Sequence, residues 1–435
     1  MNNITKIISG LLIVVIIGIV STPIIYQKQV ESYIEKNFNH NLKEISNKDS
    51  FIKLNREYIF TLTNMQQIIS SKYPDMSKKT LNEIANITNG SKILIKLNFF
   101  KYPIYHKNAI EISLLSLNKK NIQTLSNSIE GTKLLNLIKQ QAIKAFIDIN
   151  NLKIAKIKLK DIDFQVNYTK KQKLKINFEN FFIRIKNNKY DINLKKFIFI
   201  NPNNKLKLTN FNYIKIKQND FNLNDKLFIK NIIYSNFLNS LEIKNISEIM
   251  KISNIINNIN IKSNIKISKL KISKITNPNK FIEINQIKLN YDLSKINFKS
   301  LKILINNPNN QEMKKNAIRN IISNGFKMEI NPFSIKNANI NIDKPIKISK
   351  FSISLKTKLN PNNFNKQILK ANDILKQLEI DFNMITTPSN IDLISKFNPL
   401  IPIYLNSIIV RKKNNVFINL KYKNEHILSK GKILF

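Results

Sequence analysis

Two pairs of acidic residues have a spacing that could support general acid–base chemistry. Asp161 and Asp163 are two positions apart, as are Glu379 and Asp381. Side chains at i and i+2 of a β-strand lie on the same face, so Asp161 and Asp163 could form a pair of neighbouring carboxylates. Both residues lie among lysines, however, and the polar face of a solvent-exposed strand accounts for them. We therefore assign neither pair a catalytic role.

The other residue types that build active sites are scarce. The three histidines, His40, His106 and His426, lie in separate segments, and none has a partner at metal-ligand spacing. The absence of Cys excludes disulfides, thiol nucleophiles and thiolate metal sites, and 6 scattered Gly residues cannot form a glycine-rich phosphate loop. Neither a Gly-x-Ser-x-Gly nor a His-Glu-x-x-His motif occurs. We predict that the chain is not an enzyme and has no catalytic, metal-binding or cofactor-binding residues.

The strongest compositional signal is a formal net charge of +43 in 435 residues. Such a charge concentrates anions near the surface and favours contact with acidic lipid or polyanions. An A+T-rich coding sequence would explain much of it, because it raises Lys and Asn and lowers Gly, Asp and Glu together. The lysines alternate with apolar residues, as in Lys153 to Lys160, which is the pattern of a strand with one solvated face. A solvated face is the simpler interpretation, and dedicated polyanion binding is the alternative.

Aromatic residues interleave with Lys at Phe197, Phe199, Phe211 and Tyr213. In RNA-binding sheets, aromatic side chains with this placement stack on bases. The same spacing also forms the core face of an ordinary sheet. We predict no nucleic-acid partner, because the apolar N-terminal segment would carry the rest of the chain away from nucleic acid.

The elements that must position these residues are mainly β-strands. Helices are predicted at 29–48, 76–87 and 126–149, an extended segment at 50–62, and two strands within 93–117. From about residue 152, apolar and polar residues alternate, as at Ile162, Phe164 and Val166. One-sided burial of this kind predicts an antiparallel sheet.

The alternation continues toward the C-terminus, at Ile287, Leu289 and Tyr291 and then at Leu301, Ile303 and Ile305. Asn-Pro-Asn predicts type I turns at 201–203, 277–279, 307–309 and 360–362, and Asn also tolerates the left-handed conformation in this Gly-poor chain. Helices are predicted again at 312–323 and 364–378. The tail reads as strands at 408–411 and 416–422, with a short third strand near Ile433.

Residues 7–25, IISGLLIVVIIGIVSTPII, carry no charge. A helix of this length spans roughly 28 Å, close to the thickness of a bilayer's hydrocarbon core. We predict an uncleaved transmembrane signal-anchor. A cleaved signal peptide is the alternative, but Ser21-Thr22 before Pro23 is a poor cleavage site. Lys6 places the short N-terminal side in the cytoplasm by the positive-inside rule.

These patterns predict five regions and a fold class. The regions are a cytoplasmic tip at 1–6, a transmembrane helix at 7–25, a membrane-proximal α+β region at 26–150, an antiparallel β-rich region at 151–310 and a C-terminal α+β region at 311–435. The predicted fold class is α+β, mainly β. It begins with a single transmembrane helix, followed by an antiparallel, sheet-rich domain with several amphipathic helices.

The two ends of the chain carry a family resemblance. The apolar segment followed by Tyr26-Gln27-Lys28-Gln29-Val30-Glu31, with Val410 to Phe417 and Lys430-Gly431-Lys432 at the other end, resembles the YdgA-like family of bacterial envelope proteins. The resemblance covers the layout of the whole chain. It implies an inner-membrane-anchored protein of poorly defined molecular function, and it supplies no catalytic residues. A looser similarity is to the AsmA-like proteins, whose elongated β-sheets are thought to guide lipid between membranes.

From these observations we predict a single-pass inner-membrane protein with a large periplasmic domain and a non-enzymatic scaffold or maintenance role in the cell envelope. The alternative is an AsmA-like, lipid-handling β-groove. The predicted partners are the membrane through the anchor, anionic lipid or other envelope proteins, and a second copy of the chain; no cofactor is predicted. The two roles differ in one structural respect. A filled core would support the scaffold, whereas a continuous apolar face open to solvent would support the groove.

Overall fold

The chain divides into two compact units, residues 1–205 and residues 206–435. In the computed structural model, the described residues are 42–48, 53–72, 76–100, 106–150, 153–167, 173–219, 222–255, 257–306, 310–342, 344–361, 371–397, 405, 408–430 and 432–434. The boundaries predicted at residues 151 and 311 follow changes in sequence pattern, whereas this division falls between residues 205 and 206.

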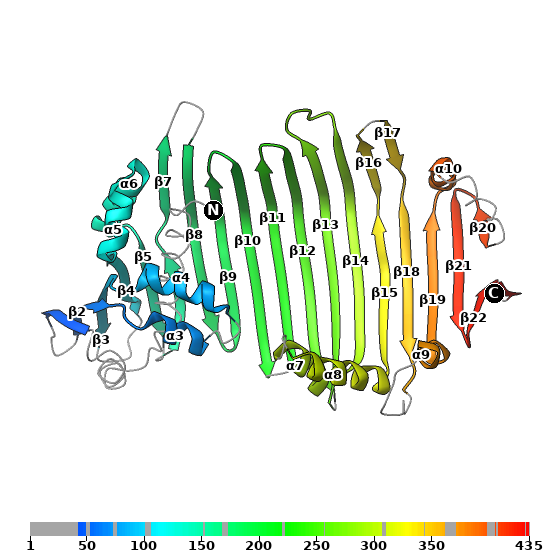
Figure 1. The fold of residues 1–435 in the computed structure, drawn as a ribbon, viewed down its shortest axis with the longest axis horizontal. Helices are drawn as coiled ribbons and strands as arrows, with labels where there is room; N and C mark the ends of the chain where they lie inside the picture. Colours follow the sequence, from blue (N-terminus) through cyan, green and yellow to red (C-terminus); the bar gives the residue numbers. More distant parts are fainter. Residues whose placement is uncertain are drawn as a thin grey trace. The chain divides into compact units, whose positions relative to one another are not determined.

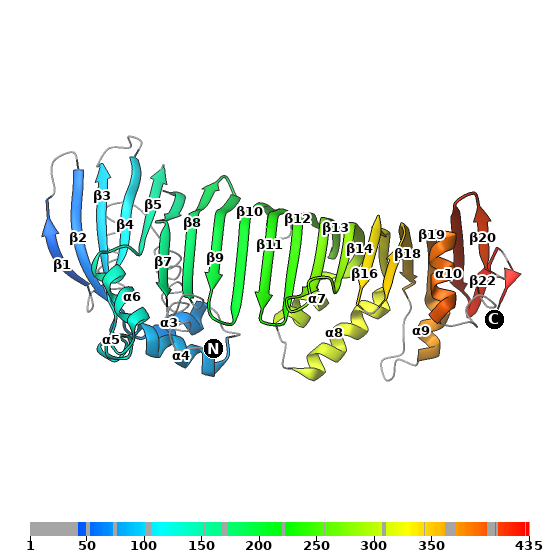
Figure 2. The ribbon, with the colours of Figure 1, turned by 90° about the horizontal axis from the view of Figure 1, so that it is seen from above.

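Unit 1 contains an antiparallel sheet in which successive strands pair as neighbours (Figures 1 and 2). Its strands are β1 (Leu42–Asn47), β2 (Lys53–Thr61), β3 (Lys92–Phe100), β4 (His106–Ser116), β5 (Lys144–Asn150), β6 (Lys153–Leu159), β7 (Ile162–Asn167), β8 (Lys173–Lys186) and β9 (Lys189–Ile200). β6 and β7 both pair with β8, one with each half of that strand. They therefore act as a single strand interrupted at residues 160 and 161.

Four helices cover one side of the unit 1 sheet (Figure 2): α3 (Met65–Lys72), α4 (Lys78–Thr88), α5 (Lys119–Ser126) and α6 (Ile129–Lys139). α3 and α4 bury their apolar stripes against β2 to β6, where Ile110, Ala145 and Ile147 are fully buried. α5 and α6 pack in the same way against β7 and β8, around Leu125 and Val166. Unit 1 is thus a two-layer structure with a filled core.

Unit 2 is also antiparallel, and its first five strands are longer than those of unit 1. The strands are β10 (Asn204–Asn219), β11 (Asn222–Asn236), β12 (Asn239–Ile255), β13 (Asn258–Lys274), β14 (Phe281–Asn297), β15 (Phe326–Ile335), β16 (Asn337–Asn341), β17 (Pro345–Ile348), β18 (Phe351–Leu359), β19 (Leu378–Thr386), β20 (Ile409–Lys412), β21 (Asn415–Lys423), β22 (His426–Ser429) and β23 (Lys432–Ile433). β12, β13 and β14 have 17 residues each, so each is about 55 Å long at ~3.3 Å per residue.

The helices described in unit 2 are α7 (Phe298–Asn306), α8 (Gln311–Asn324), α9 (Ala371–Gln377) and α10 (Pro388–Phe397). α7 and α8 contact β14 and lie at one end of the long strands, opposite the β11–β12 and β13–β14 turns (Figure 1). Ala317 of α8 and Ser300 of α7 are buried there, with Ile259 of β13. α10 packs Ile391 against β19 and β21 in a small core around Val416. The helices therefore cover two parts of the unit 2 sheet.

Asn residues make many of the turns and bulges, as the sequence predicts. Of the 14 non-Gly residues with positive φ in the described part of the chain, eight are Asn, including Asn187 and Asn188 in the β8–β9 turn. The Asn201 side chain accepts hydrogen bonds from the backbone N–H of residues 203 and 204, which confirms the turn predicted at 201–203. The turn predicted at 277–279 is confirmed as well. Residues 307–309 lie outside the described residues.

The predicted helix at 126–149 is wrong in its second half. α6 ends at Lys139, Gln141 has a φ of +48°, and β5 begins at Lys144. Ala142, Ala145 and Phe146 fit a helical spacing, but Ala145 also alternates with Ile147, and both fill the core. The predicted helix at 29–48 is likewise replaced by β1 from Leu42, because pairing with β2 overrides the local pattern; residues 29–41 lie outside the described residues.

Further along the chain, the alternation at Leu301, Ile303 and Ile305 belongs to helix α7 and not to a strand. The Asn297 side chain accepts a hydrogen bond from the Ser300 N–H and so starts this helix. The helices predicted at 76–87 and 312–323 are confirmed as α4 and α8. In the tail, β20, β21 and β23 confirm the predicted strands, whereas β22 was not predicted.

The predicted transmembrane signal-anchor requires a correction to the fold class. Among the described residues no helix is long and apolar enough to cross a bilayer. α8, with 14 residues, would be about 21 Å long, and it carries Glu312, Lys314, Lys315 and Arg319. Residues 7–25, on which the prediction was made, lie outside the described residues. The fold class that the structure supports is an extensive antiparallel sheet with short amphipathic helices.

Candidate functional site

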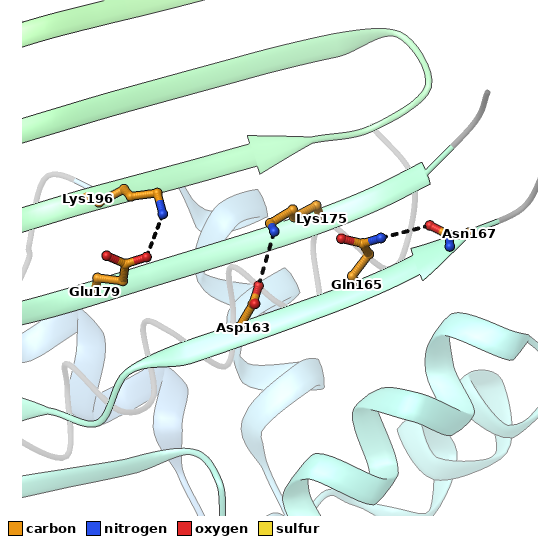
Figure 3. A network of polar contacts seen from close by, with 6 residues as sticks. All are labelled: Asp163, Gln165, Asn167, Lys175, Glu179 and Lys196. Atoms are coloured by element: carbon orange, nitrogen blue, oxygen red, sulfur yellow. Dashed lines mark hydrogen bonds and ion pairs between the residues drawn. The ribbon is translucent and has the colours of Figure 1, made fainter. Parts of the chain in front are cut away.

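The carboxylates of Asp161 and Asp163 do not form a pair. Asp161 lies in the interruption between β6 and β7, where its Oδ1 accepts a hydrogen bond from the Asn180 N–H at 2.7 Å. Asp163 lies on β7 and its Oδ1 is 3.5 Å from Nζ of Lys175 on β8 (Figure 3). The two groups therefore have separate partners, one structural and one an exposed cross-strand ion pair. Such a pair contributes little to stability.

Glu379 and Asp381 belong to charged rows on one face of the unit 2 sheet. Asp381 faces Lys356 and Lys421 on the neighbouring strands, and its Oδ1 is 3.4 Å from Nζ of Lys421. The row continues across the sheet to Glu329 and Asp292, through ion pairs of 3.0 Å from Lys356 to Glu329 and 2.9 Å from Lys262 to Asp292. Cross-strand ion pairs with lysines on this face account for both acidic residues, so we assign them a structural role.

The histidines and interleaved aromatic residues are also dispersed. His426 is exposed on β22, His106 lies on β4, and His40 lies outside the described residues. The described residues contain no cluster of His, Asp and Glu that could hold a metal ion. Phe197 and Phe199 pack against the α5–α6 core, and the Tyr213 hydroxyl donates a hydrogen bond to the Asp225 carboxylate. These three aromatic side chains therefore do not form an open stacking platform.

The opposite face of the unit 2 sheet carries apolar rows that cross eight strands, from β11 to β21. The first row is Leu223, Ile252, Ile261, Leu293, Met328, Thr357, Ile380 and Tyr422. The second is Asp225, Met250, Ser263, Tyr291, Ile330, Leu355, Phe382 and Leu420. The third is Leu227, Glu248, Ile265, Leu289, Phe333, Ile353, Met384 and Ile418. A fourth row begins with Ile229, Ile246, Ile267 and Ile287. We call these four rows the apolar face.

The middle of the apolar face is only half-buried. Its β19–β21 end is packed against α10, and the α7–α8 end includes the buried Ile259. Between these ends, Met250, Ile265 and Leu289 remain partly exposed and belong to none of the hydrophobic clusters of the described residues. The equivalent rows of unit 1 lie under α3 to α6 and are fully buried. The same alternating pattern is therefore fully buried under helices in unit 1 and only half-buried in the middle of the unit 2 sheet.

Beyond the fourth row, the apolar residues of β11 to β14 shift by one position along each strand. They resume at Ile232, Ile243, Leu270 and Ile284, which again face one another across the sheet. The residues in between include Asn245 and Gln286, both with positive φ. A strand residue with positive φ interrupts the alternation of side chains between the two faces of the sheet. The shift of one position therefore keeps the apolar residues on the same face.

A small polar group interrupts the apolar face near its centre. Oδ2 of Asp225 accepts a hydrogen bond from the Tyr213 hydroxyl at 2.8 Å, and Oε1 of Glu248 accepts one from the Ser263 hydroxyl at 2.9 Å. Asp225 and Ser263 are 9% and 5% exposed. Oδ1 of Asp225 has no hydrogen-bond partner among the described residues. A buried carboxylate with one free oxygen depends strongly on the single donor that it has.

Tyr213 should be important for stability because it is that donor. Burial, together with the Asp225 carboxylate, raises the pKa of Tyr213 to about 12. Tyr213→Phe is expected to lower the free energy of unfolding by about 1–3 kcal/mol in urea at pH 7. Since the folded pKa lies above the usual 10.0, the contribution is complete below pH 10 and is lost as the pH rises through 12.

Tyr291→Phe is the matched control for this substitution, because Tyr291 lies in the same row as Asp225 and its hydroxyl makes no hydrogen bond to another described residue. It should change the unfolding free energy by less than about 0.5 kcal/mol. Equal losses for the two variants would contradict the proposed dependence of Asp225 on Tyr213.

Comparison with known proteins does not identify the chain: no protein-family model matches it, and neither does a curated protein or a solved structure. The resemblance to the YdgA-like family therefore stays a prediction.

Proposed function

We propose that unit 2 binds the hydrocarbon chains of lipids along its apolar face. The observation that supports this proposal is the half-buried middle of that face, where apolar rows cross successive strands without a second layer of described residues. An acyl chain laid on these rows would gain about 0.8 kcal/mol for each CH₂ group removed from water. Contact with several methylene groups is then enough to offset the cost of immobilising a ligand.

The half-buried face favours this function over a purely structural scaffold. A scaffold needs a filled core, and unit 1 has one. In unit 2 the described residues leave the middle of the apolar face half-buried, although folded proteins rarely leave a broad apolar surface unless it binds something. The lysines of the opposite face keep that side in solvent. The sheet is therefore amphipathic, and the envelope setting implied by the family resemblance supplies lipid as a ligand.

The test is a pair of matched substitutions on opposite faces of the central strands. Ile267→Asp places a carboxylate on the apolar face between Ile246 and Ile287. Ile249→Asp makes the same change on the charged face, where Ile249 is 46% exposed. We expect Ile267→Asp to weaken binding of a fluorescent fatty acid to the full-length chain at least tenfold, because a charge on a hydrocarbon-binding surface must be desolvated. Ile249→Asp should leave binding unchanged.

Photo-crosslinking with a fatty acid that carries a diazirine on its chain locates the contact. Peptides from β12 to β14 should be labelled in the wild-type chain and in Ile249→Asp, but not in Ile267→Asp. Circular dichroism confirms that both variants retain the sheet. Equal binding by all three proteins, or labelling confined to unit 1, would refute the proposal.

A further inference from the structure

Three successive turns of unit 2 expose large apolar side chains at one end of the sheet. They are the β11–β12 turn with Phe237 and Leu238, the β13–β14 turn with Ile275, and the β16–β17 turn with Ile342. These side chains are 65%, 56%, 45% and 44% exposed, respectively. All three turns lie at the end of the long strands away from α7 and α8 (Figure 1). We call these four residues the turn surface.

The three turns form one continuous edge. The Ile275 N–H donates a hydrogen bond to the Leu238 carbonyl at 2.8 Å, which joins the first two turns. Nδ2 of Asn341 donates to the Asn279 carbonyl at 2.7 Å, which joins the second turn to the third. The exposed apolar residues are therefore held together on a hydrogen-bonded edge and are not independent loop tips.

Lysines flank the turn surface. Lys274 and Lys280 begin and end the β13–β14 turn, and Lys344 lies two positions after Ile342. The turn sequences 236–239, 274–280 and 341–345 contain one acidic residue, Asp343, which lies outside the described residues. Apolar tips with a surrounding belt of Lys match the layered chemistry of a bilayer surface, because apolar groups enter the headgroup region while the ammonium groups remain at the level of the lipid phosphates.

We propose that the turn surface docks onto an anionic lipid membrane, with Phe237 and Leu238 inserted among the lipid headgroups. A globular protein partner would be matched better by a concave or flat apolar patch than by protruding turns with a basic belt. The inference deepens the proposed function by naming a membrane as the source of the lipid, but its test does not depend on acyl-chain binding. The four rows of the apolar face lie between the α7–α8 end and the middle of the strands, and the apolar residues that continue them at Ile232, Ile243 and Leu270 lead toward the turn surface. A docked edge would place these continuing residues nearest the bilayer.

The absence of Cys allows a site-specific test on the full-length chain. Phe237→Cys carries an environment-sensitive fluorophore at the turn surface. Met313→Cys carries the same fluorophore on α8 at the other end of the strands, where Met313 is 46% exposed. Local insertion is measured with vesicles that contain about one-third phosphatidylglycerol and with pure phosphatidylcholine vesicles. Because the readout is local, binding through another part of the chain does not imitate it.

With the anionic vesicles we expect the label at position 237 to shift to the blue and to be quenched by lipids brominated near the headgroup, and the label at position 313 to do neither. Pure phosphatidylcholine should give less than a tenth of the response. Replacing Lys274, Lys280 and Lys344 together by Gln should raise the lipid concentration at half-response roughly a hundredfold, since each Lys near an anionic surface contributes about fivefold.

The inference is overturned if the label at position 237 stays in water, or if the labels at positions 237 and 313 respond equally. The two proposals can fail separately. If Ile267→Asp loses fatty-acid binding but the label at position 237 does not insert, the lipid-binding face is supported and the docking edge is refuted. If the label at position 237 inserts but Ile267→Asp binds fatty acid as the wild-type chain does, the docking edge is supported and the lipid-binding face is refuted.

Discussion

Ile147→Ala is expected to lower the free energy of unfolding of unit 1 by about 2–5 kcal/mol, whereas Ile267→Ala should cost unit 2 about 1 kcal/mol. Both substitutions remove the same atoms from the middle of a strand, so chemistry and secondary structure are matched. Ile147 on β5 is 0% exposed and lies in the core beneath α3 and α4. Ile267 on β13 is half-buried on the apolar face.

The expected difference comes from the layer above each residue. Truncation of Ile147 leaves a cavity enclosed by neighbours such as Ile110 and Ile157, and the lost contacts add to the lost transfer free energy. Truncation of Ile267 leaves a depression that solvent can fill, so only part of the transfer term is lost. The comparison thus measures directly whether the apolar face is covered.

Hydrogen exchange of the full-length chain, read separately for β5 and β14, distinguishes the two units. This readout is preferable to a single unfolding curve because two units need not unfold together. A cost for Ile267→Ala as large as that for Ile147→Ala would show that another part of the chain covers the apolar face, and it would contradict the proposed lipid-binding surface.

The antiparallel sheet was predictable because its cause is local. Alternation at Ile162, Phe164 and Val166 gives one buried and one solvated face, and β7 has that arrangement. The substitution of Asn for Gly in turns was predictable for the same reason, since a single residue determines whether positive φ is tolerated. Where two local patterns coincide, prediction fails: Leu301 and Ile305 are spaced by four and also belong to an alternating run, and the residues between them fold as α7.

The candidate site needed information that no local pattern contains. Its apolar rows join residues from eight strands, and their alignment depends on the register of every pairing. Whether a second layer covers an alternating strand is equally absent from its own sequence. Part of the site did carry a signal, because Asp225, Glu248 and Ser263 each occupy a position where the alternation requires an apolar residue. A polar residue at such a position indicates a polar group on an otherwise apolar face.

Gly131→Ala should destabilise unit 1 by about 3 kcal/mol or more, although Ala is normally the better residue inside a helix. Gly131 is in the first turn of α6, where its N–H donates a hydrogen bond to the Ser128 hydroxyl that caps the helix. A Cβ at this position would lie 1.9 Å from the backbone oxygen of Leu125 and 2.5 Å from its carbonyl carbon. Backbone atoms cannot rotate away, so α5 and α6 would have to separate.

The separation of α5 and α6 would expose the core that they share. Leu125 is 0% exposed and packs with Leu134 and Val166, so a shift of either helix disrupts the contacts of β7 as well. Asn136→Ala is the control: Asn136 is exposed on the same helix, and this substitution should stabilise slightly through helix propensity. Thermal unfolding and the hydrogen exchange of β7 measure both variants. If Gly131→Ala gained stability as Asn136→Ala does, the close approach of the two helices, and with it the filled core that distinguishes unit 1 from the open face of unit 2, would be refuted.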